Sequence, residues 1–354
     1  MSHELFTGSV GLSSKSLAGA GGADVVHAGT PRIMASTHVQ SLDVSHPLNP
    51  LKLPFSTALV PQLSTWFELH LKTPLGAMVC CLLALLQMPA SCPNTLAELA
   101  PIPDKLVVLT FDDSVASQYS VVRPLLKKYG FRATFFITEG FSFRTNKADY
   151  MTWEQIAELN RDGFEIGNHT RDHLGVTPGN VSLLREQIEA IEMRCAQHGI
   201  PKPSSFAYPG NGIHTNALPI LHQLGIRFAR RGGAPEFPYE KGEGSAFEPG
   251  KDHPLLIPSA GDARPTWTLT NFVEAATQAK DGRIAVLQFH GVPDRDHPWV
   301  NTPEPLFRQY MEFLHANHYR VIAMRDLSEF VDPDKLPQNP VAIIEERKNR
   351  RRSP

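Results

Sequence analysis

The chain has 354 residues, of which 42% are hydrophobic and 20% are charged, which indicates a globular protein with one large domain or two modest ones. Its formal net charge is -2, and lysine and arginine are dispersed along most of its length, so there is no electrostatic case for nucleic-acid binding. Basic residues gather only near the carboxyl end, and we expect residues 333–354 to form a basic, solvated tail.

The amino-terminal region lacks the pattern of a folded domain. Residues 1–70 mix Gly, Ser, His and Pro without periodicity, so we expect them to be poorly ordered. An uncharged apolar run follows within residues 71–92. It is shorter than the roughly 20 residues that a stable membrane span needs, but it suits the core of a signal peptide. A buried helix of the domain is the alternative.

An export signal is expected at the start of a protein, which suggests that translation begins near residue 70 and that export removes the segment up to about Cys92. The ending Pro-Ala-Ser-Cys92 faintly resembles a lipoprotein cleavage box, so a lipid anchor is a further possibility. Of the other cysteines, Cys80 and Cys81 lie in the same stretch and only Cys195 lies beyond it, so we expect no disulfide framework in the part of the chain after residue 92.

From residue 106 onward, short apolar runs alternate with amphipathic stretches, which is typical of repeated βα units. The expected strands are residues 106–111, 133–137, 164–167, 205–208, 226–229, 284–289 and 319–323. The expected helices are residues 115–129, 153–161, 181–197, 216–224, 270–280 and 304–317, with an irregular stretch at 231–268. About seven such units favour an α/β fold of the distorted (β/α) barrel type, in one domain over residues 104–332. In such barrels, reactive residues gather where the strands end.

Two adjacent carboxylates, Asp112 and Asp113, follow the first expected strand. Neighbouring side chains on an extended backbone point in opposite directions, so the pair can share one site only if the chain turns there. A helix cap or a solvated turn is the alternative for such a pair.

Two histidines, His169 and His173, follow the strand expected at 164–167. Imidazoles four residues apart lie on one side of a helical turn and can reach a single ion, although surface histidines are the alternative. One carboxylate and two imidazoles from two strand ends are a complete ligand set for a catalytic ion that keeps open positions for water.

Two further segments end expected strands. Phe206-Ala-Tyr-Pro-Gly210 would expose backbone amides to a developing oxyanion, or it is a simple tight turn. Leu287-Gln-Phe-His290 ends in a histidine that would act as a general acid, or that has a purely structural role.

The order Thr-Phe-Asp-Asp, His-Thr-x-x-His, Phe-x-x-Pro-Gly and Leu-x-x-His resembles that of the polysaccharide deacetylase family, the NodB-homology domain of carbohydrate esterase family 4. The resemblance covers about residues 104–330. It implies a general base at Asp112, a general acid at His290, and one divalent metal ion, usually zinc, bound by Asp113, His169 and His173. It also implies that Tyr208 and Leu287 line the substrate pocket and that the amide of Gly210 helps to stabilise the oxyanion.

The sequence departs from the family pattern at two places. Ala207 stands where the family often has an arginine that orients the catalytic aspartate, so that support must come from elsewhere or be absent. The family's motif with Asp and Trp before the last strands is not clear, and Asp262 and Trp267 are loose candidates.

The resemblance implies removal of N-acetyl groups from an amino-sugar polymer or oligomer, with release of acetate. Removal of O-acetyl groups from a carbohydrate is the nearest alternative, because the same site serves both reactions. A catalytically silent carbohydrate-binding barrel is the alternative from another class. Trp299 would stack on a sugar ring, or it is simply an exposed loop residue.

Overall fold

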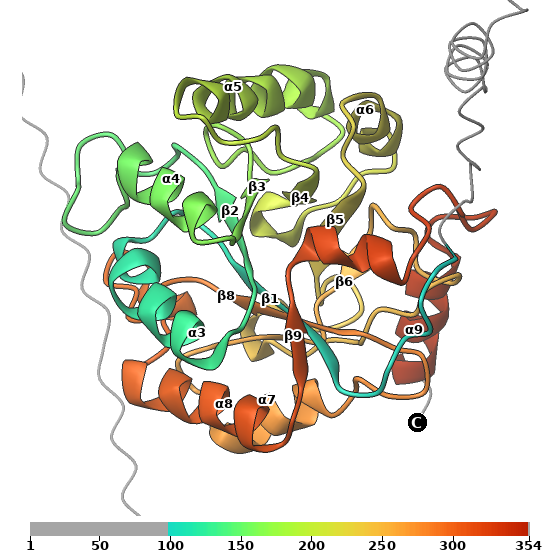
Figure 1. The fold of residues 1–354 in the computed structure, drawn as a ribbon. Helices are drawn as coiled ribbons and strands as arrows, with labels where there is room; N and C mark the ends of the chain where they lie inside the picture. Colours follow the sequence, from blue (N-terminus) through green and yellow to red (C-terminus); the bar gives the residue numbers. More distant parts are fainter. Residues whose placement is uncertain (1–97, 353–354) are drawn as a thin grey trace, which may run out of the picture. The chain divides into compact units, whose positions relative to one another are not determined.

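The computed structural model describes residues 98–352, which belong to one unit of the chain (Figure 1). The predictions for residues 1–70 and 71–92 lie outside the described residues. Within the described part of the chain, no helix has both the length and the apolar character needed to cross a bilayer.

The unit alternates strands and helices. Its strands are β1 (Leu106–Phe111), β2 (Thr134–Ile137), β3 (Glu165–Asn168), β4 (Ser205–Ala207), β5 (Phe228–Gly232), β6 (Ile257–Pro258), β7 (Gly261–Asp262), β8 (Ala285–Phe289) and β9 (Arg320–Ile322). Its α-helices are α3 (Arg123–Tyr129), α4 (Trp153–Arg161), α5 (Leu184–Gln197), α6 (Ala217–Gln223), α7 (Leu269–Ala276), α8 (Glu304–Ala316) and α9 (Ala342–Arg352).

The strands form one parallel sheet in the order β6-β5-β4-β3-β2-β1-β8-β7, with β9 paired to β1. The end strands β6 and β7 are consecutive in the chain, and the residues between them bond to both sides. The amide of Ser259 donates to the carbonyl of Gly232 in β5 (3.1 Å), and the amide of Ala260 donates to Val286 in β8 (2.7 Å). The segment 257–262 thus closes the sheet, and the prediction of a distorted (β/α) barrel is confirmed.

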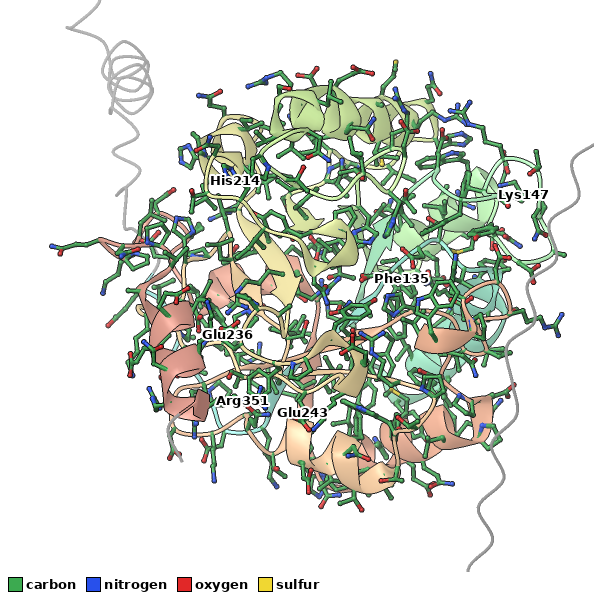
Figure 2. All side chains as sticks on the ribbon, turned by 180° about the vertical axis from the view of Figure 1, so that it is seen from behind. Phe135, Lys147, His214, Glu236, Glu243 and Arg351 are labelled. Carbon is green, nitrogen blue, oxygen red and sulfur yellow. The ribbon has the colours of Figure 1, made fainter. Side chains whose placement is uncertain are left out.

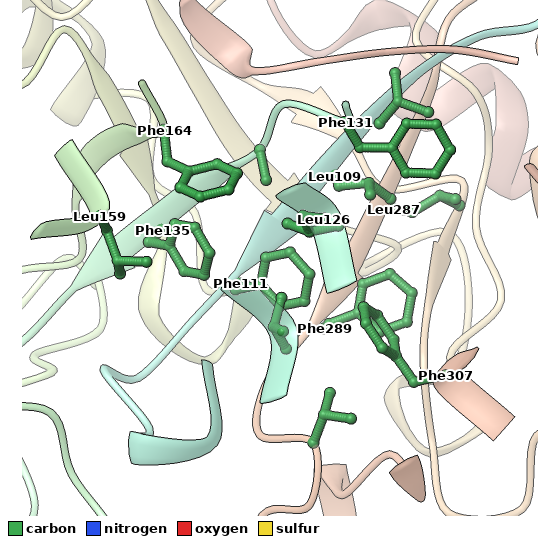
Figure 3. Packing of buried hydrophobic residues seen from close by; sticks show 14 of the residues in the cluster. Leu109, Phe111, Leu126, Phe131, Phe135, Leu159, Phe164, Leu287, Phe289 and Phe307 are labelled. Atoms are coloured by element: carbon green, nitrogen blue, oxygen red, sulfur yellow. The ribbon is translucent and has the colours of Figure 1, made fainter. Parts of the chain in front are cut away.

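The sheet is buried on both faces, as the unbroken apolar sequence of β1 predicts. Side chains alternate along this strand. Leu109 and Phe111 face the surrounding helices and pack with Phe135 and Phe307 (Figure 3), whereas Val108 faces the barrel interior. Figure 1 shows the helices α3 to α8 around the outside of the sheet. The interior is therefore left for a second, smaller apolar cluster and for the polar groups described below.

Local sequence explains where several helices begin and end. Thr152 and Gln155 form a reciprocal capping box that starts α4 at the predicted residue. The helix expected at 115–129 is present as one continuous helical stretch from residue 116 to residue 129, with a π-helical turn at Gln118–Val122 directly before α3. Pro124 stands in the first turn of α3, directly after the π-helical turn, where a proline is tolerated because it lacks an amide hydrogen.

The carboxyl-terminal residues form the helix α9, which packs against the domain. Ile343 and Ile344 are buried in the cluster that covers β4, β5 and α6. Arg347 is only 7% exposed and pairs with Asp252 at 2.8 Å. The guanidinium of Arg351 donates to the carbonyl of Glu236, and Figure 2 labels both residues. The prediction of a solvated tail is therefore wrong for these residues, because two apolar side chains and a buried ion pair hold the helix down.

Candidate active site

A cavity of about 110 Å³ opens where the strands of the barrel end. It contains polar side chains from the segments that follow β1, β3, β4 and β8, as the barrel architecture predicts. Its lining residues are Asp112, Asp113, Phe141, His169, His173, Gly210, Asn211, Tyr239, Gln288, His290, His297, Trp299 and Val300.

The backbone turns sharply after β1, which brings both aspartates of the pair to this cavity. Asp113 and Ser114 adopt left-handed conformations with φ of 71° and 58°. The Ser114 hydroxyl stabilises the turn, since it donates to the carbonyl of Thr138 (2.9 Å) and accepts from the Thr138 amide (3.0 Å). The turn required by the sequence is therefore present. It stores local strain of the kind that is concentrated at functional sites.

Asp113, His169 and His173 come together as a possible set of metal ligands. Oδ1 of Asp113 lies 3.4 Å from Nε2 of His169 and 3.3 Å from Nε2 of His173, and the three ligand atoms lie within 4.8 Å of one another. Bonds of about 2.0–2.2 Å to a tetrahedral zinc ion would place neighbouring ligand atoms roughly 3.3–3.6 Å apart. The two measured distances fit this geometry.

The backbone fixes the orientation of His169. Its Nδ1 lies 2.8 Å from the carbonyl oxygen of Ala207, which can only accept a hydrogen bond, so Nδ1 carries the hydrogen. Nε2 is then the atom available to bind an ion, and such a carbonyl partner is typical of metal-binding histidines. The residue at position 207 therefore contributes to the site through its main chain.

The protonation of the three residues also favours a bound cation. Burial would raise the pKa of Asp113, but the nearby His169, His290 and His173 outweigh it and hold this pKa below its usual value. Burial, together with the nearby His169, lowers the pKa of His173 to about 4. Burial also acts to lower the pKa of His169, but the negative charges of Asp112 and Asp113 prevail and raise it. The site thus holds a carboxylate and a neutral imidazole, beside a second imidazole whose proton a metal ion would displace.

Asp112 is held apart from this set by an arginine that sequence reasoning missed. Nη2 of Arg230 donates to Oδ2 of Asp112 at 2.5 Å, and Nε2 of Gln288 donates to the same oxygen at 3.2 Å. Oδ1 of Asp112 has no hydrogen-bond partner among the described residues. The expected strand 226–229 ended before Arg230, although two arginines in an otherwise apolar run were a signal that a buried charge is needed there.

His290 faces the same aspartates from the end of β8. Its Nε2 lies 3.9 Å from a carboxylate oxygen of Asp112 and of Asp113, and its Nδ1 lies 3.8 Å from Oδ1 of Asp262. Asp262 is itself paired with Arg264 at 2.5 Å. Burial raises the pKa of Asp262 despite the opposing charges of His290 and Arg264. Asp262, which the sequence suggested as a possible residue of the family's Asp-and-Trp motif, thus lies next to Nδ1 of His290, the expected general acid.

Gly210 lines the cavity, but the other two residues expected beside it do not. Tyr208 is buried on the outer face of the sheet, where its hydroxyl donates to the carbonyl of Leu255 (3.0 Å). Leu287 lies in the apolar cluster between sheet and helices, as Figure 3 shows. The prediction that Tyr208 and Leu287 line the pocket is wrong, because strand alternation turns both away from the barrel interior. The other loose candidate, Trp267, donates its indole hydrogen to the carbonyl of Lys241 (2.9 Å).

Aromatic side chains form the rim of the cavity. Phe141 and Trp299 are 49% and 59% exposed, which is unusual for such large apolar groups. The ring of His297 lies between them, with its centroid 4.4 Å from that of Phe141 and 5.4 Å from that of Trp299. Sequence reasoning singled out Trp299 but not Phe141 or His297, which belong to no local motif.

Comparison with known proteins matches residues 100–229 to the family described as polysaccharide deacetylase. Over 128 residues, the chain is 30% identical to the peptidoglycan-N-acetylglucosamine deacetylase of Bacillus cereus, a match that covers 36% of this chain and 56% of that protein. Over 137 residues it is 26% identical to the poly-beta-1,6-N-acetyl-D-glucosamine N-deacetylase of Staphylococcus aureus, covering 36% of this chain and 47% of that protein.

Among solved structures, the family 4 acetyl xylan esterase from Clostridium thermocellum, in complex with a cobalt ion, matches with 21% identity and a TM-score of 0.45. That match covers 65% of this chain and 95% of the other. The chain spans between about a quarter and a little over half of the length of the curated relatives it matches.

Proposed function

We propose, from the match of residues 100–229 to the polysaccharide deacetylase family, that the protein is a metal-dependent hydrolase that removes N-acetyl groups from an amino-sugar polymer or oligomer. The observation that carries the proposal is the convergence of Asp113, His169 and His173 beside the separate carboxylate of Asp112. The names of the two curated relatives above support an N-acetylated glycan as the substrate class.

The proposed cofactor is one divalent metal ion, and zinc suits the donor set of two imidazoles and one carboxylate. Oδ1 of Asp113 is a buried oxygen without a hydrogen-bond partner among the described residues, which fits an atom reserved for an ion. When bound, the ion supplies Lewis-acid activation of both the amide carbonyl and the attacking water.

The protein's own residues then supply the proton transfers. Asp112 would accept the proton of the attacking water at Oδ1, the oxygen that its neighbours leave free. His290 would donate a proton from Nε2 to the departing amine, which leaves well only when protonated. Asp262, 3.8 Å from Nδ1 of His290, would stabilise the positive charge of that imidazole. The backbone amide of Gly210 is proposed to stabilise the oxyanion.

Acetate release tests the proposal directly. Purified protein loaded with zinc is incubated with chito-oligosaccharide and, in parallel, with acetylated xylan, and acetate is measured over time. Release from the first substrate that exceeds release from the second supports N-deacetylation, and the reverse order would assign the site to O-acetyl esters. Binding of either glycan without acetate release, in protein shown by elemental analysis to hold a metal ion, would contradict hydrolysis and favour a silent binding barrel.

We further propose that the protein is exported, because a polymeric cell-surface glycan of the kind in the relatives' names lies outside the cell. The apolar run within residues 71–92 is the expected signal. Sequencing the amino terminus of the native protein tests this, since export predicts a start close to Cys92, and an intact terminus at residues 2–30 would reject it. A lipid on Cys92, detectable by mass spectrometry of the terminal peptide, would add an anchor.

A further inference from the structure

Arg230 carries a buried charge next to the reacting groups. We propose that Arg230 is the positioning residue of Asp112, which it holds from the neighbouring strand so that one carboxylate oxygen is fixed and the other faces the water to be activated. This inference rests on the proposed function, and its test is designed so that the two can fail separately.

The hydrogen bonds around Asp112 are asymmetric. Arg230 and Gln288 both donate to Oδ2, whereas Oδ1 has no partner among the described residues. Two donors from different strands on one oxygen restrain the carboxylate against rotation about its last bond. Oδ1 is therefore presented in a single direction, which is what a base needs when its partner is a small, mobile water molecule.

The sheet register explains how an arginine on β5 reaches an aspartate after β1. Arg230 is the register partner of Ala207 on β4, so side chains at both positions point to the barrel interior. The methyl group of Ala207 leaves room there for the long side chain. The guanidinium lies 5.5 Å from the ring centroid of Phe136, on the far side of β4 and β3. The guanidinium thus crosses the barrel and ends at Oδ2 of Asp112.

The adjacent Arg231 provides an internal comparison. It is also fully buried and also pairs with a carboxylate, that of Glu236 at 2.5 Å. Alternation along β5 turns it to the opposite face of the sheet, away from the cavity. Two consecutive arginines of β5 thus each form a buried ion pair with a carboxylate. Only the partner of Arg230, Asp112, is a residue of the proposed active site.

The matched variants are Arg230→Lys and Arg231→Lys. Each keeps a buried positive charge but replaces the planar guanidinium by a shorter ammonium group. The single hydrogen bond from Nη2 of Arg230 to Asp112 depends on the reach of the longer side chain. Arg230→Lys is expected to lower kcat by about 100-fold, because a displacement of about 1 Å at a reacting group has an effect of that size. KM and the zinc dissociation constant should stay within about threefold, since Arg230 contacts no proposed metal ligand. Arg231→Lys should leave kcat unchanged, whatever its melting temperature.

A relocation variant separates positioning from mere stability. Because positions 207 and 230 are register partners, Ala207→Arg combined with Arg230→Ala returns a guanidinium to the barrel interior from the neighbouring strand. This double variant should have at least about tenfold higher kcat than Arg230→Ala alone. Equal kcat for Arg230→Lys and Arg231→Lys, or zinc loss in Arg230→Lys, would overturn the assignment.

A crystal structure of Arg230→Lys keeps the inference testable even if the wild-type protein releases no acetate, an outcome that would count against the proposed function alone. The expected result is a carboxylate of Asp112 that has rotated, with Oδ1 no longer directed into the cavity. An unchanged carboxylate in that structure would overturn the role of Arg230 independently of any assay.

Discussion

The neighbouring aspartates should respond differently to the same substitution, Asp to Asn. Oδ1 of Asp113 lies 3.4 and 3.3 Å from the two histidine nitrogens, whereas the nearest oxygen of Asp112 lies 4.0 Å from His169 and is already bonded to Arg230. Asp112→Asn should therefore keep zinc but lose turnover. A general base contributes about 10²–10⁴-fold to rate, so the barrier should rise by about 3–5 kcal/mol.

Asp113→Asn should instead lose the metal, because it removes the one anionic ligand of the proposed three. We expect zinc affinity to fall by more than about 100-fold, since even changes to groups behind a ligand cost about 10–100-fold. Zinc affinity is measured by competition with a chromophoric chelator, and turnover is measured as acetate release at saturating zinc.

Folding has to be controlled in both variants. Asp112→Asn leaves the buried Arg230 without its anionic partner, which is destabilising. Assays are therefore run well below the melting temperature of each variant. The reasoning would be refuted if Asp112→Asn lost zinc as severely as Asp113→Asn, or if Asp112→Asn turned substrate over at more than about a tenth of the wild-type rate.

Trp299→Ala should raise KM about tenfold with little change in kcat, since an exposed ring at the rim of the cavity offers stacking area to a sugar. Met193→Ala is the control, because Met193 on α5 is equally exposed. Equal KM values for the two variants would contradict the binding of sugar by Trp299. Zinc affinity should rise about tenfold per pH unit up to the raised folded-state pKa of His169 and then level off, because zinc binding displaces one proton from this residue. Chelator competition between about pH 5 and 8 measures the affinity. A slope of two in the logarithm of zinc affinity against pH would contradict a single titrating ligand. In the metal-free protein the same proton stabilises the fold below the ordinary histidine pKa, and this stabilisation is lost as pH rises through the folded-state pKa. Arg347→Met should lower the free energy of unfolding by about 3–5 kcal/mol, whereas the exposed Arg350→Met should change it by less than about 1 kcal/mol in chemical denaturation; equal losses would refute the anchoring of α9.

Much of the barrel could be predicted because its signals are local. The strand β1 begins and ends at the predicted residues, since an apolar run bounded by turn residues has only one way to be buried. The helix α4 also begins and ends at the predicted residues, and its start is marked by the Thr152 and Gln155 of a capping box. The metal-ligand candidates were found for the same reason, since each motif sits directly after such a strand.

The residues that were missed depend on contacts between distant segments. The strands β6 and β7 have two residues each, too few to show any periodicity, so Asp262 appeared to lie in an irregular loop. The role of Arg230 could not be read from the sequence, because it depends on the register of β5 against β4 and on a side chain that crosses the barrel. A local motif identifies the side chains at the end of one strand, but it does not identify the side chains from other strands that contact them.

Charge balance explains why two consecutive aspartates can have different roles. Three buried carboxylates lie in this region, Asp112 and Asp113 at the cavity and Asp262 next to His290. Two of them have an arginine partner at 2.5 Å, Asp112 with Arg230 and Asp262 with Arg264. The ion pairs of Asp113 are all with histidines, which carry charge only when protonated. Burying an anion without a permanent cation is costly, so this position is where the barrel gains most from binding a metal ion. The two arginines thus determine which carboxylate remains free to bind the ion and which ones serve the proton transfers.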